Sequence, residues 1–77
     1  MITIYVHMKD GRVFEYDVAD VAKAREHVYR IANEGFRHNT EGKENVEFTF
    51  YPVHKIEKVV FIVDKADYEM LKYPVRS

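Results

Sequence analysis

The chain has 77 residues, with 12 basic and 13 acidic side chains and no cysteine. A chain of this length forms one domain, so we expect residues 1–77 to be a single α+β unit. The lack of cysteine excludes disulfides, thiolate zinc sites and a cysteine nucleophile. The formal net charge is −1. Proteins dedicated to binding nucleic acid or membrane surfaces typically carry a clear excess of basic residues, which this chain does not have.

The start of the chain shows no basic stretch followed by a long apolar run, the pattern of a signal peptide. The longest apolar run, residues 59–63, is far shorter than a membrane span. We therefore expect a cytoplasmic protein with no membrane partner.

The first two elements form a predicted hairpin. Apolar and polar residues alternate over 2–8 and again over 13–18, a period that indicates β-strands. The turn between them contains Gly11, and the length of this turn sets the register in which the two strands pair. A two-residue loop would place carboxylates among the aliphatic side chains, whereas a three-residue loop with a G1 bulge pairs Val6 with Phe14. We therefore predict the three-residue loop.

A helix is predicted next, from Val18 or Ala19 to Glu34, with Asp17 as its cap and Gly35 as its stop. One face of this helix carries charged residues at i,i+4 spacing, which is typical of a solvent-exposed surface. The other face is apolar. The apolar residues fall at helical spacing and predict the face that packs on the sheet: Val21, Ala24, Val28, Ile31 and Ala32.

The polar segment 37–45 is predicted to be a loop. Strands are expected over 46–51 and about 58–63, followed by a short helix over 64–74 that Asp64 caps. The predicted order is ββαββα, with a four-stranded, mainly antiparallel sheet and the main helix on one face. The last strand is apolar on both sides, which favours a place in the middle of the sheet, in the order 2-1-4-3.

In this arrangement Phe48 and Phe50 face the main helix. The opposite face of the sheet gathers an apolar and aromatic patch, which monomers rarely leave in water. The C-terminal helix, a second copy of the chain or a different macromolecule could cover this patch. Its members are Tyr5, His7, Val13, Thr49 and Tyr51, with either Val60 and Ile62 or Val59, Phe61 and Val63.

We interpret the chain as a non-catalytic binding protein without metal or cofactor. The four histidines show no metal-ligand spacing, the only serine is Ser77, and the three glycines stand apart. The preferred partner is a second copy, and another protein is possible. The residues expected at that interface are Tyr5, Tyr51, Val60 and Ile62. The alternative is a nucleic-acid binder that uses a basic edge formed by Arg25, Arg30, Arg37 and Lys55.

Three stretches of the chain carry a family resemblance: KDGRVFEYDV (9–18), AKAREHVYRIANEGF (22–36) and FTFYPVHKIEKVV (48–60). Together they resemble short uncharacterised proteins of bacterial phages and mobile elements. Those proteins show a hairpin, a helix, a glycine stop and an aromatic strand that ends in Y-P-x-H-[KR]-I. The resemblance covers residues 1 to about 63, and the chain departs from it after Asp64. It implies a small accessory protein that acts by binding, and it implies no activity, cofactor or site residue.

Overall fold

The structure is a computed structural model that describes residues 1–66 and residue 68. It confirms an α+β fold with one main helix and antiparallel sheets. The predicted C-terminal helix lies mostly outside the described residues. The elements, in chain order, are β1 (Ile2–Met8), β2 (Val13–Val18), α1 (Val21–Glu34), β3 (Phe36–Glu41), β4 (Val46–Tyr51), the short 3-10 helix η1 (Val53–Lys55) and β5 (Ile56–Phe61).

The main sheet has three strands in the order β2-β1-β5. Val6 lies opposite Phe14 and Ile4 opposite Tyr16, which confirms the register of the three-residue loop. Gly11 has a φ of 100° and its N–H donates to the carbonyl of Met8 at 3.0 Å. A side chain rarely adopts this left-handed conformation, so the glycine makes the bulge possible.

β5 pairs with β1 as predicted, but it lies at an edge of the described sheet and not in its middle. The neighbour expected on its far side, β4, pairs with β3 instead. Phe61 lies opposite Ile4 on the core face, and Val60 lies opposite Tyr5 on the other face. Of the two possible alternations, the structure therefore has Val60 pointing away from the helix.

The helix begins two to three residues later than predicted, because Asp20 and not Asp17 caps it. The Asp20 side chain accepts a hydrogen bond from the backbone N–H of Lys23 at 2.9 Å. Asp17 stays in β2, where its carboxylate accepts a hydrogen bond from the Thr3 hydroxyl at 2.7 Å. The predicted stop is confirmed: Gly35 has a φ of 99° and donates its N–H to the carbonyl of Ile31.

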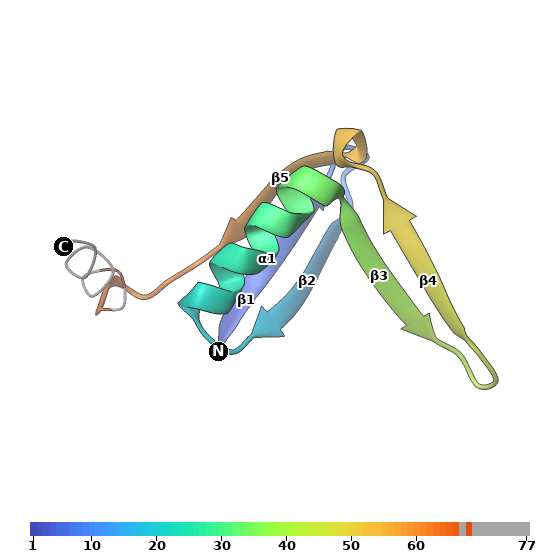
Figure 1. Cartoon of the computed structure of the whole chain (residues 1–77), viewed down its shortest axis with the longest axis horizontal. Coiled ribbons are helices and arrows are strands. Elements are labelled where there is room, and N and C mark those ends of the chain that lie inside the picture. Colours follow the sequence, from blue (N-terminus) through green and yellow to red (C-terminus); the bar gives the residue numbers. More distant parts are fainter. Residues whose placement is uncertain (67, 69–77) are drawn as a thin grey trace.

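The core lies between the main sheet and α1, which crosses one face of that sheet (Figure 1). Ile4 and Val6 are completely buried there, as the alternation of β1 predicts. Ala32, expected on the packing face of the helix, is exposed. The buried core residues are Ile2, Ile4, Val6, Met8, Val18, Ala24, Ile31 and Phe36.

The second sheet is a two-stranded ribbon of β3 and β4, which projects away from α1 and the main sheet (Figure 1). A hydrogen bond of 2.8 Å from Gly42 N–H to the Asn45 carbonyl closes its turn. The predicted loop over 37–45 and the predicted four-stranded sheet are therefore wrong. Most of β3 is exposed, so no buried apolar face marks it as a strand in the sequence. Phe48 and Phe50, expected against the helix, are exposed as well.

Candidate functional site

The most exposed aromatic side chains described by the structure, apart from two tyrosines, lie on one face of the ribbon. Val46, Phe48 and Phe50 are 46%, 62% and 67% exposed, and alternate positions of a strand share a face. Cross-strand neighbours also share a face, which adds three residues of β3 opposite them. We call this set the aromatic ribbon face: Arg37, Asn39, Glu41, Val46, Phe48 and Phe50.

The base of the ribbon is anchored to the main sheet by contacts between aromatic rings. Phe36 is buried, and its ring centroid lies 5.3 Å from that of Phe14 in β2. Tyr51 lies opposite Phe36 in the ribbon, with its ring centroid 5.6 Å from that of Phe14. Ring pairs at these separations are favourable, so the ribbon starts from a packed base while its far end extends outward.

Arg12, in the turn of the β1–β2 hairpin, reinforces this anchor. Its Nη1 donates to the Tyr51 hydroxyl at 3.1 Å, and its Nε pairs with the Asp10 carboxylate at 2.8 Å. The guanidinium also lies 5.6 Å from the Phe14 ring centroid and 5.2 Å from that of Tyr51, within the range of cation–π attraction. The backbone N–H of Arg12 lowers the pKa of Asp10, and the hydrogen bond to Tyr51 raises the pKa of Arg12.

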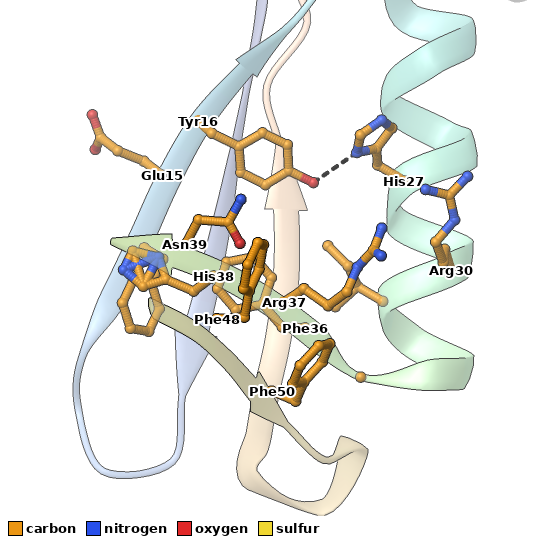
Figure 2. Close-up of a pocket in the computed structure, with 13 residues that line it drawn as sticks. Glu15, Tyr16, His27, Arg30, Phe36, Arg37, His38, Asn39, Phe48 and Phe50 are labelled. Carbon is orange, nitrogen blue, oxygen red and sulfur yellow. Dashed lines mark hydrogen bonds between the residues drawn. The ribbon is translucent and has the colours of Figure 1, made fainter. Parts of the chain in front are cut away.

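A cleft of about 750 Å³ lies between α1, β2 and the ribbon. Two of the residues that line it share a hydrogen bond of 2.9 Å, between the Tyr16 hydroxyl and Nδ1 of His27 (Figure 2). Burial raises the pKa of Tyr16, and the nearby charge of Arg30 opposes that shift in part. The hydroxyl of Tyr16 is therefore protonated at neutral pH. Both Phe48 and Phe50 line this cleft.

The cleft carries more positive than negative charge. Arg30 comes from α1 and Arg37 from β3, and Figure 2 shows Arg37 reaching toward the helix. Glu15 is the one carboxylate among the lining residues, and its side chain points away from the other labelled groups in Figure 2. Among the described residues, no ion pair is formed by either arginine. An aromatic and apolar wall with two unpaired guanidinium groups favours an acidic partner that also carries apolar surface.

The four predicted interface residues do not form one surface. Tyr5 and Val60 lie side by side on the sheet face opposite α1. Ile62 follows the end of β5 and is 66% exposed. Tyr51 lies at the base of the ribbon, because its strand, β4, pairs with β3 and not with the main sheet. The predicted place of Tyr51 on the main-sheet face is therefore wrong, and the role of these four residues at an interface stays a prediction.

The sheet face opposite α1 is also more polar than predicted. Without Thr49 and Tyr51 from β4, its apolar members are Tyr5, Val13 and Val60. Polar and charged side chains alternate with them and are satisfied in water or by the Thr3–Asp17 hydrogen bond. These are Thr3, His7, Glu15, Asp17 and Lys58.

Only two of the four residues of the predicted basic edge lie in the cleft. Arg30 and Arg37 both line the cleft, whereas Arg25 and Lys55 do not. Arg25 lies on α1 and Lys55 in η1, both exposed. Sequence reasoning also placed Phe48 and Phe50 wrongly, against the helix instead of on an exposed face. Their alternation showed that they share a face, but not whether that face is buried.

The histidines lie on four different elements: His7 on β1, His27 on α1, His38 on β3 and His54 in η1. Within residues 1–66 and 68, no group of three or more potential metal-binding side chains gathers. In the same part of the chain, no helix is long and apolar enough to span a bilayer.

Comparisons of the chain with models of known families, with curated proteins and with solved structures found no match. The resemblance to short phage and mobile-element proteins therefore stays a prediction, and any inference about function starts from the ribbon and the cleft.

Proposed function

We propose that the chain is a small non-catalytic binding protein that acts as a homodimer, with the aromatic ribbon face as its contact surface. The observation that carries the proposal is the exposure of Phe48 and Phe50, 62% and 67%, on a ribbon that projects from the domain (Figure 1). An isolated two-stranded hairpin is marginally stable in water. Burial of the aromatic ribbon face against a second copy would stabilise the ribbon.

Three further considerations support self-association. Exposed apolar patches on monomers commonly mark interaction sites, and most small soluble oligomers are two-fold dimers. The net charge of −1 leaves little repulsion between copies. The lack of cysteine supports the cytoplasm as the compartment in which the dimer acts.

The experiment is a measurement of molar mass by light scattering behind size exclusion, over a hundredfold range of concentration. We expect twice the chain mass of 9.2 kDa down to the low micromolar range. The dimer should persist in high salt, because an apolar interface is not weakened by screening. A mass of one chain throughout would contradict the proposal.

Single-stranded nucleic acid is the second candidate partner, because the cleft places Arg30 and Arg37 beside Phe48 and Phe50. Bases stack on exposed aromatic rings while arginine contacts phosphate. It is less favoured, because Glu41 lies on the same face of the ribbon and would repel phosphate. Fluorescence anisotropy with a labelled single strand separates the two candidates. This candidate requires binding that weakens steeply between about 50 mM and 200 mM salt.

A further inference from the structure

The aromatic ribbon face carries opposite charges at its two ends. Arg37 lies at the base of the ribbon and Glu41 near its tip, with the uncharged Asn39 midway between them. Along a strand, four residues span about 13 Å, so these two charges lie at opposite ends of the face. In the part of the chain that the structure describes, no ion pair involves either of them.

A two-fold axis can bring these charges together when two ribbons pack face to face. The axis lies between the two ribbons, perpendicular to their strands, at the level of Asn39 and Phe48. Such an axis reverses the direction of the second ribbon, so that Arg37 of each copy faces Glu41 of the other. Phe48 then packs on its own counterpart, and Phe50 packs on Val46 of the second copy. The other possible axis, parallel to the strands, would place Arg37 over Phe50 and leave both charges against apolar side chains, which costs free energy.

We infer that the cleft of each copy receives the ribbon tip of the other, with the two ribbons antiparallel and two Arg37–Glu41 ion pairs across the interface. This inference rests on the proposed homodimer and adds its orientation and its specificity-determining pair. The tip carries Glu41, Lys43 and Glu44, two acids against one base. The cleft that receives it carries Arg30 and Arg37, which form no ion pair with any residue that the structure describes, so the charges of the two surfaces are complementary.

The size of the ribbon face gives an independent reason for contact with the cleft. A standard stable interface takes about 20–30 residues from each partner, and the aromatic ribbon face supplies six. In the antiparallel arrangement the tip of one ribbon lies over the base of the other, where the cleft opens. Contacts between the tip and the cleft walls would then add to the area that the ribbon face buries.

The test is a pair of charge reversals. At low ionic strength, Arg37→Glu places two carboxylates opposite each other at both contacts, and Glu41→Arg places two guanidinium groups there. Like charges that face each other across an interface are strongly unfavourable. Each variant should therefore raise the dimer Kd by about tenfold or more. The double variant restores opposite charges and should regain a Kd near that of the unchanged chain. Circular dichroism checks that each variant folds.

Mixing the two single variants gives the sharpest result. In a mixed dimer, one contact joins the two substituted positions, where the introduced carboxylate faces the introduced guanidinium. The other contact joins the two unchanged side chains, Arg37 and Glu41, so a heterodimer should form that neither variant forms alone. Native mass spectrometry distinguishes it by mass.

Two outcomes separate this inference from the proposal on which it rests. A wild-type dimer that tolerates both reversals and shows no preference for the mixed pair would overturn the antiparallel arrangement alone. A monomeric wild-type chain would overturn the proposed function as well.

Discussion

Replacing both Phe48 and Phe50 with serine should leave the chain a monomer at concentrations where the unchanged chain is a dimer. Each buried phenylalanine contributes roughly 2–3 kcal/mol of apolar burial, and both side chains occur in each copy of the interface. The dimer Kd should therefore rise at least a hundredfold, by order of magnitude. Both rings are exposed within one copy, so the fold itself should lose little stability. Light scattering gives the mass, and thermal unfolding checks the fold.

Ile62→Ser is the matched control, because Ile62 is 66% exposed and belongs to the interface that the sequence alone predicts. It should leave the dimer intact. If Ile62→Ser splits the dimer while the double serine variant does not, the second copy packs on the main sheet and not on the ribbon. The pair of variants thus chooses between the two apolar surfaces of the molecule.

Gly35→Ala should lower the free energy of unfolding by about 2 to 4 kcal/mol. Gly35 joins α1 to β3 with a φ of 99°, a conformation that side chains rarely adopt. An added Cβ would also collide with the backbone carbonyl oxygen of Tyr51. The collision can be relieved only by moving the backbone that anchors the ribbon. Urea unfolding followed by circular dichroism measures the loss.

Gly11→Ala serves as the control for backbone conformation alone. Gly11 has nearly the same φ, 100°, but nothing lies within 4 Å of the position its Cβ would take. Its substitution should therefore cost only the strain of the positive φ, about 1 kcal/mol. Equal losses for the two variants would show that the collision with the Tyr51 carbonyl adds nothing to the cost of the Gly35 substitution.

The parts of the fold that the sequence predicts correctly are those with a buried face. The register of the first hairpin follows from keeping carboxylates away from aliphatic side chains, and Val6 does lie opposite Phe14. The end of α1 follows from Gly35, which no other residue replaces easily at that φ. Its start was harder to predict, because Asp17 and Asp20 are both suitable caps and only the continuation of β2 through Val18 decides between them.

The ribbon could not be predicted in the same way. β3 is polar along most of its length, so its sequence is typical of a loop, and backbone pairing with β4 makes it a strand. β4 pairs with β3 and not with β5, so it does not extend the main sheet. This one pairing moves Tyr51 to the ribbon anchor and exposes Phe48 and Phe50. Arg30 and Arg37 were named from their charge, but only the fold shows that they share a cleft.

The most direct measurement of ribbon-to-ribbon association is a distance between two spin labels on Lys43→Cys, a site at the ribbon tip. The chain has no cysteine of its own, so each copy carries one label. In the antiparallel dimer the two tips lie on opposite sides of the axis, about four residues from it. A strand rise of about 3.3 Å and a separation of about 10 Å between packed sheets place them roughly 30 Å apart. A peak near that distance is the expected result. Tips within about 15 Å of each other, or no distance between copies at all, would contradict the account.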